Sequence, residues 1–506
     1  MVKLLFLLLL LIPSLSFGAT YYVATTGTDN AGCEATSSPC ATVNYVLQNK
    51  VSAGDTIKMK AGNYGTTQGW IRFNNTTNHD NVTLTADDPL NPPTLVGTNA
   101  NPTYITIGPN YGDAGVDGVI ISYLSIRYRN DTIAADGMGI INIGGLDTTI
   151  DHCTIFQGQT GIAIRTSKRT TISNNTIYNC GVLGSGNDAH GIGIYNYQGA
   201  SVATGWSERI WIYNNVIYNC SGDGLQDVSG QASPGNAVKY LDIENNTIYG
   251  NDEQALDFKG SSYVRIHGNN LSNNGYGGIG TNSSYGPHQY WWIYNNKIHD
   301  HVDYAILPQG AQGCYCNNGA MCEKYWYIYN NLIYNNSTGT SNSPAVNMPD
   351  DGGNSYFYNN TVYNTNGATA TGNKSGIIPC DNGNNIKNNI FFNNGTDAND
   401  HGNIRAYAGE DSGTPDHNYV YPTTCGSGSC TTGTNAVTSS NPGMTNPSGG
   451  DFTLLNTSVC KDAGVNLGSS YNVDYIGTSR PQGAAWDIGA YEVGKQPSAP
   501  TNLRIQ

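Results

Sequence analysis

A seven-residue pattern recurs along the middle of the chain, with apolar residues on either side of an Asn-Asn pair. Its form is apolar, any residue, Asn, Asn, any residue, apolar, aromatic, as in Ile172–Tyr178, Ile212–Tyr218 and Ile243–Tyr249. The second Asn of each copy falls at Asn175, Asn215, Asn246, Asn270, Asn296, Asn331, Asn360 and Asn389. Because the apolar residues keep their register around each pair, the pattern indicates a structural repeat and not a polar low-complexity tract.

The spacing of these copies predicts the architecture. Successive second Asn residues are 24 to 40 positions apart, which fits one coil of three short strands with insertions at one loop. A propeller blade would need four strands and about 40 residues every time. Stacked coils place equivalent residues about 4.8 Å apart, so the Asn side chains can hydrogen-bond up and down the stack. We therefore predict an all-β, single-stranded right-handed parallel β-helix of about ten coils.

The flanking sequence predicts how the coils begin and end. Residues 1–19 have the basic start, apolar centre and small residues of a signal peptide, so the mature chain is expected to be secreted or displayed at the cell surface. Residues 20–105 form an N-terminal cap and first irregular coils, with an amphipathic helix near 41–51 covering the open edge. The repeats occupy 106–400 and a C-terminal cap 401–495. Residues 496–506 are interpreted as a linker or tail, with a further attachment possible.

Composition narrows the partners. Only 12% of residues are charged and the net charge is −14, which disfavours nucleic acid because a phosphate-binding surface needs basic residues. No segment after the signal peptide is apolar enough to cross a membrane. Twelve cysteines in an exported chain favour disulfides, and Cys33–Cys40 and Cys425–Cys430 are predicted to bridge locally.

Alignment of the strand that follows each Asn corner predicts which side chains point outward. Its third residue points inward in every copy, as the list Ile162, Ile192, Leu225, Leu256, Ile279, Ile306 and Val346 shows. The outer face then gathers polar residues within a few coils, namely Arg165, His190, Tyr195, Asp223, Gln226, Asp257, Lys259, Asn282 and Tyr304. The same alternation turns Asp227 inward unless a bulge intervenes.

Segments near both ends carry a resemblance to a known group of proteins. Thr20–Asp29, Gly54–Ile57 and Ala61–Tyr64 resemble the opening of secreted right-handed β-helix proteins of the pectate-lyase superfamily. Arg480-Pro481 and Asp487–Glu492 resemble their closing segment. The resemblance implies the fold over nearly the whole mature chain. It leaves the activity open, because the group includes lyases, hydrolases, epimerases and proteins without known chemistry.

A second resemblance concerns the chemistry. Ala255–Asn269 is similar to the strand that carries the catalytic lysine in family-six alginate lyases and chondroitinase B, and to the Phe-Lys strand of family-nine pectate lyases. It implies β-elimination of an acidic, uronic-acid-containing polysaccharide, with Lys259 as the base and Arg165 or His190 assisting. Family six has an arginine one coil later, where this chain has Gly280–Asn282.

The resemblance to these lyases also implies a Ca²⁺ site, and the outer face offers residues that could bind the substrate. Ca²⁺ would be held by carboxylates and would stabilise the substrate carboxylate. Its predicted ligands are Asp223, Asp227 and Asp257. The predicted substrate-binding residues are Tyr195, Gln226, Asn282 and Tyr304.

Two other functions stay open. Ala189-His190-Gly191 resembles the Gly-His-Gly strand of polygalacturonases, although the preceding Asn-Thr-Asp strand of that family is missing. A non-catalytic glycan-binding or adhesive protein would instead use aromatic rings that stack on sugars. Its candidates are Trp206, Trp211, Trp291, Trp292 and Trp326.

Overall fold

A computed structural model describes residues 18–494 except for short gaps. The gaps are 31, 66–67, 75–77, 98–103, 109–114, 129–136, 196–206, 229–236, 283–287, 310–323, 340–342, 350–354, 366–373, 381–382, 397–399, 407–412 and 427–428. The predicted signal peptide, apart from Gly18 and Ala19, and the predicted tail lie outside the described residues. None of the described helices has the length and apolar character needed to cross a bilayer.

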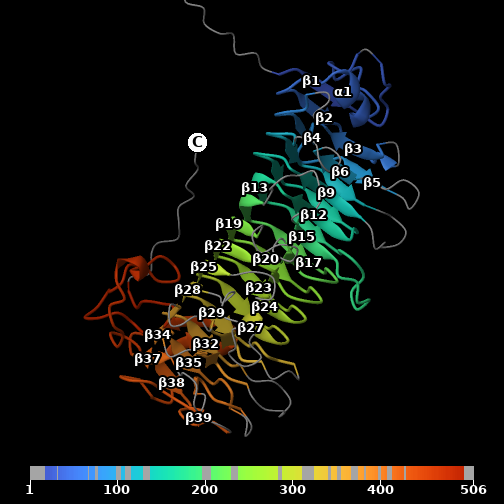
Figure 1. Cartoon of the computed structure of the whole chain (residues 1–506). Coiled ribbons are helices and arrows are strands. Elements are labelled where there is room, and N and C mark those ends of the chain that lie inside the picture. Colours follow the sequence, from blue (N-terminus) through green and yellow to red (C-terminus); the bar gives the residue numbers. More distant parts are fainter. Residues whose placement is uncertain are drawn as a thin grey trace, which may run out of the picture.

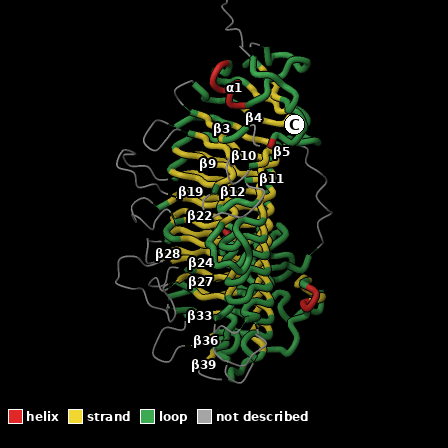
Figure 2. Tube along the Cα trace, turned by 90° about the vertical axis from the view of Figure 1, so that its right-hand side faces the viewer, coloured by secondary structure: helices red, strands yellow, loops and turns green. Residues whose placement is uncertain are grey.

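The described chain winds into a stack of coils, each with one strand in each of three long parallel sheets (Figure 1). We call these sheets A, B and C; they contain 14, 12 and 11 strands. Figure 2 shows the strands of successive coils piled into ladders, with the only described α-helix, α1 (Val43–Asn49), at the N-terminal end. The predicted right-handed parallel β-helix is confirmed.

The strand bounds are as follows. Sheet A contains β1 (Thr20–Val23), β2 (Thr56–Met59), β4 (Thr83–Ala86), β7 (Ile120–Ser122), β10 (Thr149–Asp151), β13 (Lys168–Ser173), β16 (Glu208–Tyr213), β19 (Val238–Glu244), β22 (Ser261–His267), β25 (Gln289–Tyr294), β28 (Lys324–Tyr329), β31 (Tyr356–Tyr358), β34 (Asn385–Lys387) and β37 (Thr414–Asp416). Sheet B contains β5 (Thr94–Val96), β8 (Ser125–Arg127), β11 (Thr154–Phe156), β14 (Thr176–Tyr178), β17 (Val216–Tyr218), β20 (Thr247–Tyr249), β23 (Asn270–Ser272), β26 (Lys297–His299), β29 (Leu332–Tyr334), β32 (Thr361–Tyr363), β35 (Ile390–Phe392) and β38 (Tyr419–Tyr421).

Sheet C, which carries the candidate site, contains β3 (Trp70–Phe73), β6 (Tyr104–Ile107), β9 (Met138–Ile143), β12 (Thr160–Arg165), β15 (His190–Tyr195), β18 (Leu225–Asp227), β21 (Leu256–Phe258), β24 (Gly277–Asn282), β27 (Tyr304–Gln309), β30 (Val346–Asn347) and β33 (Ile377–Ile378). The remaining elements are β36 (Arg405–Ala406), β39 (Ser429–Cys430), β40 (Met444–Asn446), β41 (Asp451–Leu454) and the 3₁₀ turns η4 (Pro447–Gly449) and η5 (Ser469–Tyr471).

The corner between sheets A and B is held by a ladder of buried asparagines. The side-chain amide of Asn175 donates to Oδ1 of Asn215 at 3.0 Å, and Asn215 donates to Asn246 at the same distance. Each Oδ1 also accepts the preceding ladder residue's backbone N–H, so the buried polar groups at this corner are satisfied. The ladder continues through Asn269, Asn296, Asn331, Asn360, Asn389 and Asn418.

One predicted ladder residue is wrong by one position. Asn269 forms the ladder, and Asn270 instead begins β23. The first residue of each pair takes a left-handed conformation, with φ of 56° at Asn174 and 57° at Asn214. Gly268 fills that position in the irregular copy, with φ of 68°, because glycine adopts left-handed backbone without a steric cost.

The corner between sheets B and C repeats this plan with mixed residues. A left-handed residue is followed by an inward side chain, as at Asn219 and Cys220. Oδ1 of Asn251 accepts the backbone N–H of Cys220 at 2.9 Å, and His301 continues the column two coils later. Cys180 and Cys220 are buried and not disulfide-bonded, so they act as apolar residues of the interior at this corner.

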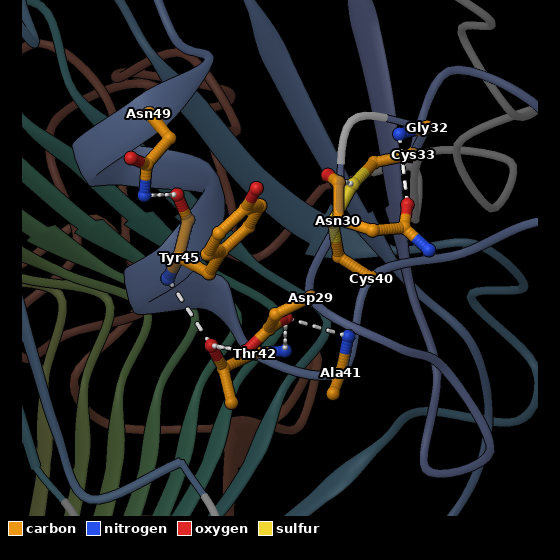
Figure 3. Close-up of a disulfide and its surroundings, with 9 residues drawn as sticks. All are labelled: Asp29, Asn30, Gly32, Cys33, Cys40, Ala41, Thr42, Tyr45 and Asn49. Carbon is orange, nitrogen blue, oxygen red and sulfur yellow. Dashed lines mark hydrogen bonds between the residues drawn. A yellow bond between two sulfur atoms is a disulfide. The ribbon is translucent and has the colours of Figure 1, made fainter.

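The N-terminal end is closed by α1 and a disulfide. Thr42 Oγ1 accepts the backbone N–H of Tyr45 and caps the helix, whose buried face is Val43, Val46 and Leu47. Figure 3 shows the Cys33–Cys40 disulfide beside this turn, with Asp29 accepting hydrogen bonds from the backbone of Ala41 and Thr42. Cys425 and Cys430 form the second predicted bridge.

The C-terminal segment differs from the predicted cap in where it lies. Coils continue past residue 400 through β37 and β38, and the following chain then runs back beside earlier coils (Figure 1). Asn330 Nδ2 donates to the carbonyl of Val473 at 2.8 Å, and the backbone N–H of Ala490 donates to Thr361 Oγ1. The segment therefore covers the side of the last coils. Its predicted closing motif forms a buried network around Arg480, which pairs with Glu492 at 3.0 Å.

Candidate functional site

The outer face of sheet C contains an open groove of about 530 Å³. We call it the acidic groove. Its lining residues are Asp188, Gln226, Val228, Glu253, Gln254, Asp257, Lys259, Tyr276, Asp303, Tyr304, Leu307 and Ser343. Four of the residues that the sequence placed on this face lie together here, namely Gln226, Asp257, Lys259 and Tyr304.

The strand register explains how these residues meet. Gly193, Gln226, Asp257 and Gly280 pair in sequence across β15, β18, β21 and β24, so they form one outward column. The inward column beside it is the predicted one, and all its members are fully buried. Strand alternation therefore fixes the outward direction of Gln226 and Asp257.

The two glycines of this column make room for two tyrosines. A Cβ on Gly193 would lie 2.3 Å from the phenol oxygen of Tyr195, and one on Gly280 would lie 2.8 Å from that of Tyr304. Both rings lie over these glycines; Tyr304 is nearly fully buried and Tyr195 is half-buried. The Tyr304 phenol accepts a hydrogen bond from Gln254 Nε2 at 3.0 Å. Gln226 and Asp257 are thus flanked by an aromatic ring on either side.

Lys259 forms an ion pair with Asp257 at the floor of the acidic groove. The Lys259 side chain is 17% exposed and that of Asp257 is 4% exposed. Burial by itself would lower the pKa of Lys259, but the charges of Asp257, Asp223 and Glu253 raise it above its ordinary value. Lys259 is therefore protonated at neutral pH while these carboxyl groups carry their charge.

The carboxyl groups around Lys259 are shifted in the other sense. Burial raises the pKa of Asp223 well above its usual range, and the charges of Asp257 and Glu253 raise it further. Burial also raises the pKa of Asp257 against the opposing effect of Lys259, and it raises that of Glu253 together with the charges of Asp188 and Asp257. The single ammonium group of Lys259 therefore lies among several carboxyl groups and cannot neutralise all of their charges at once.

His190 links two of these acids. Burial lowers the pKa of its imidazole to about 4, so the ring is neutral at pH 7. Its Nδ1 accepts the backbone N–H of Asp223 at 3.2 Å, which places the ring proton on Nε2. That Nε2 lies 3.3 Å from Oδ1 of Asp188 and donates toward it. His190 therefore orients Asp188 and the Asp223 backbone, and both of its nitrogens are engaged.

The structure corrects the predicted metal ligands. Asp227 is fully buried and points inward in register with Ile194 and Phe258, where Ser261 Oγ donates to it at 2.7 Å. No bulge turns it outward, so it is not placed to share an ion with Asp257. Ligand atoms of Asp188, His190 and Asp223 lie within 4.8 Å of one another. Because His190 Nε2 carries a proton, the oxygen donors that this cluster offers to a cation are the carboxylates of Asp188 and Asp223.

Arg165 lies away from this cluster. It sits on β12, three strands before β21, which Lys259 directly follows, and this is about 14 Å along the stack. Its guanidinium is 5.6 Å from the ring centroid of Tyr195 and contacts Met138. Tyr195 itself contacts Thr160 Oγ1 at 3.3 Å. Arg165 and Tyr195 therefore form a neighbouring pair that does not line the acidic groove.

The predicted binding residue Asn282 stays untested, and two of the predicted sugar-stacking tryptophans lie in the interior. Asn282 ends β24 and pairs with Gln309, but its side chain lies outside the described part of the chain. Trp291 and Trp326 are fully buried and stack on each other at 4.9 Å, so they cannot serve as surface sugar platforms. Trp206 lies outside the described residues, whereas Trp211 and Trp292 are half-buried on sheet A.

Asp188 is the main residue that the sequence analysis missed. It lies on the loop before β15, where the strand alignment had not begun, and its side chain is 59% exposed. The available signal was its position two residues before His190, at the end of a Gly- and Ser-containing insertion. Tyr276 and Asp303 were missed for the same reason, because they too precede the aligned strands.

Comparisons with known proteins agree with the fold. A family model described as a right handed beta helix region matches residues 101–239. No curated protein matches the chain. The family match and the three parallel sheets confirm the predicted right-handed parallel β-helix.

Three solved structures illustrate the range of similar proteins. The A-module of the mannuronan C-5 epimerase AlgE6 of Azotobacter vinelandii is 19% identical over 66% of this chain and 92% of its own, with a TM-score of 0.42. XylC in complex with xylose is 11% identical over 94% and 99%, with a TM-score of 0.49. Pectate lyase Pel9A is 15% identical over 95% and 97%, with a TM-score of 0.38. These similarities concern the fold and leave the activity open.

Proposed function

We propose that this chain acts on an acidic polysaccharide and cleaves uronic-acid-containing chains by β-elimination in the acidic groove. One observation carries the proposal: Lys259 stands at the groove floor among Asp257, Asp223 and Glu253. Elimination requires a base for the C5 proton and positive charge beside the sugar carboxylate. Among the described residues that line this groove, Lys259 is the only cationic side chain.

The charge balance sets the conditions for Lys259 to act as the base. With its carboxylate neighbours ionised, the raised pKa keeps a proton on Nζ. Asp188, Asp223 and Asp257 could hold Ca²⁺, and this ion, when bound, would supply positive charge that stabilises the substrate carboxylate. If these acids were ligands of the ion, their charges would favour the ammonium form of Lys259 less, and Nζ in its neutral form could accept the C5 proton.

The remaining lining residues suit substrate positioning. The Gln226 amide donates to Asp223 Oδ2 at 3.1 Å and lies between the rings of Tyr195 and Tyr304. Tyr276 is half exposed at the rim, where its ring can stack on a sugar. Secretion, with removal of residues 1–19, belongs to the same proposal, because it would bring the groove to extracellular polymers.

Hydrolysis is the second candidate, and a specific observation supports it. The pKa values of Asp223, Glu253 and Asp257 are all raised, and a glycosidase needs one carboxyl group that stays protonated as the general acid. The two reactions leave different products. Elimination gives an unsaturated uronate that absorbs ultraviolet light, whereas hydrolysis gives new reducing ends without that absorbance.

The test is a product assay on alginate, pectate and glycosaminoglycans, with and without a calcium chelator. We expect ultraviolet absorbance and reducing ends to rise together on at least one polymer, and chelation to lower the rate. Reducing ends without absorbance would establish hydrolysis. Absence of both signals on every polymer would contradict the enzymatic proposal. Any variant that removes Lys259 also removes a positive charge. Lys297→Ala, which removes an ammonium from the outer face of sheet B, is the matched control for that loss of charge.

A further inference from the structure

A second groove, of about 350 Å³, lies on the outer face of sheet A. We call it the tryptophan groove. Its lining residues are Arg209, Trp211, Tyr240, Leu241, Asp242, Tyr263, Arg265 and Trp292. It occupies strands β16, β19, β22 and β25, which follow directly after the sheet C strands of the acidic groove. Neither the β-elimination proposal nor the matched β-helix region assigns it a role.

The strand register places a tryptophan at each end of the tryptophan groove, which forms a narrow slot. Trp211, Asp242, Arg265 and Trp292 pair in sequence across the four strands and form one outward column. With strands about 4.8 Å apart, the two indoles are separated by about 14 Å. The far face of Trp292 is covered by Tyr327, whose ring lies 5.6 Å away at an angle of 10°. The other face of Trp292 is therefore directed into the groove.

The floor of the slot is polar and balanced in charge. Arg265 forms an ion pair with Asp242, and His267 Nε2 lies 3.1 Å from the other carboxylate oxygen. Asp242 is 12% exposed and Arg265 is 54% exposed, so the guanidinium edge remains accessible from solvent. Arg209 at the rim lies 3.4 Å from Glu208. Each arginine thus has a carboxylate partner, and the slot offers no excess positive charge for an acidic ligand.

The rim carries backbone strain that points to the use of its side chains. Tyr240 and Tyr263 have φ of 58° and 59°, a region that costs a non-glycine residue roughly 1–2 kcal/mol. The left-handed residues at the separate corner between sheets A and B are mostly Asn, which tolerates this backbone better, whereas the column of Tyr240 and Tyr263 contains only Arg and Tyr from Arg169 to Tyr325. The tyrosines stack at 4.9 Å and are 45% and 37% exposed, with their edges toward solvent. The same stack continues through Tyr290 and Tyr325, so the rim of the groove is part of a longer exposed aromatic column.

We propose that the tryptophan groove binds sugar rings of a neutral glycan. A pyranose presents C–H groups on its faces and hydroxyl groups around its edge. The indoles of Trp211 and Trp292 match the faces, and the Asp242–Arg265 pair can accept from and donate to neighbouring hydroxyls. Phenol groups of Tyr240 and Tyr263 add hydrogen-bonding edges at the rim.

This binding surface is distinct from the acidic groove and does not rest on the proposed elimination. The two grooves lie on separate sheets and share no lining residue, so a glycan held on sheet A leaves the sheet C groove open. The protein would thereby attach to a neutral component of an extracellular matrix while acting on an acidic component.

Calorimetric titration of the full chain with cellohexaose, xylohexaose and mannohexaose tests the inference, with hexagalacturonate as the acidic comparator. We expect at least one neutral hexasaccharide to bind. Trp211→Ala and Trp292→Ala should each weaken that binding at least tenfold, and Asp242→Asn should weaken it several-fold. Trp70→Ala, which removes an exposed tryptophan from sheet C, should leave it unchanged.

Two further results decide between binding and stability. Trp292→Phe keeps a ring stacked on Tyr327, so it should fold and retain most of the affinity if Trp292→Ala fails to fold. Absence of binding by every neutral hexasaccharide, or tighter binding of hexagalacturonate that the tryptophan variants abolish, would overturn the inference. Unchanged affinity in both folded tryptophan variants would overturn it as well.

Discussion

Two outward columns on the same four coils share one arrangement, with polar residues between aromatic rings, but they differ in their balance of charge. On sheet C, Gln226 and Asp257 lie between Tyr195 and Tyr304; on sheet A, Asp242 and Arg265 lie between Trp211 and Trp292. The sheet A charges are paired and partly exposed, and hydrogen bonding and charge from His267 and Arg265 outweigh burial and lower the pKa of Asp242.

The sheet C column differs because its acids outnumber its cation and are buried. The result is a raised pKa at Asp223, Glu253 and Asp257. Balanced charge suits recognition of a neutral ligand, whereas unbalanced buried charge suits proton transfer or binding of a cation. One repeat can therefore carry a reactive face and a binding face, and the difference is made by a few side chains.

Replacement of Lys259 should produce the largest difference between the activities of the two faces. Lys259→Met should lower the rate of unsaturated-product formation about 1000-fold, because it removes the proposed base and the positive charge beside the substrate. The tryptophan groove should keep its affinity for neutral oligosaccharides. Kinetics and titration on the same preparation check both. Equal loss on both faces would indicate misfolding, and a retained rate would show that the groove works without Lys259.

The fold could be predicted from sequence because stacking repeats one local rule. Apolar residues such as Ile192 and Leu225 recur at the inward position, and they share one column in the structure. The Asn269/Asn270 slip arose where Gly268 replaced the first Asn, so the pair looked the same but began one residue later. Pattern matching alone cannot separate two adjacent asparagines whose roles differ in φ.

The site was less accessible to sequence reasoning. Strand alternation correctly turned Asp257 outward and Asp227 inward, yet the family resemblance led us to assign both as metal ligands. Asp188 comes from a loop whose path no repeat encodes. Arg165 shares an outward position with Lys259 but lies three strands away. Which coils act together depends on distance along the stack, and this is a property of the folded molecule.

A ladder substitution should weaken the frame beneath both faces. Asn246→Ala removes hydrogen bonds to Asn215, Asn269 and the carbonyl of Ile212. Because buried partners are left unsatisfied, the free energy of unfolding should fall by about 3 kcal/mol in denaturant titrations. Asn245→Gly, at an exposed left-handed position like that of Gly268, should change it by less than about 1 kcal/mol. Equal losses of unfolding free energy in the two variants would contradict the claim that the second asparagine of each pair stabilises the coils.

Acid should destabilise the sheet C side through His301, which precedes β27. Burial lowers the pKa of His301 to about 3. Its neutral form is therefore favoured by folding, and the stability is present above the unfolded pKa near 6.5 and lost as pH falls below it. Between pH 7 and pH 4 this residue should account for about 3 kcal/mol of lost unfolding free energy.

His301→Asn provides the comparison for that pH effect. Neighbouring coils have Asn274 and Asn336 at the same position, so the variant should continue the ladder. Denaturant titrations at pH 7 and pH 4 should show a smaller loss of stability in the variant than in the wild type. An identical pH dependence would mean that His301 is not the buried neutral group described here.

The most direct test of the central claim, that Lys259 removes the proton in the acidic groove, is the rate of unsaturated-product formation by Lys259→Arg. Arginine keeps the positive charge, but its pKa is too high for it to accept a proton. The account predicts that this variant still binds the polyuronate and loses product formation by at least 100-fold at every pH. A rate close to that of the wild type would show that Lys259 supplies only charge, and would contradict its role as the base.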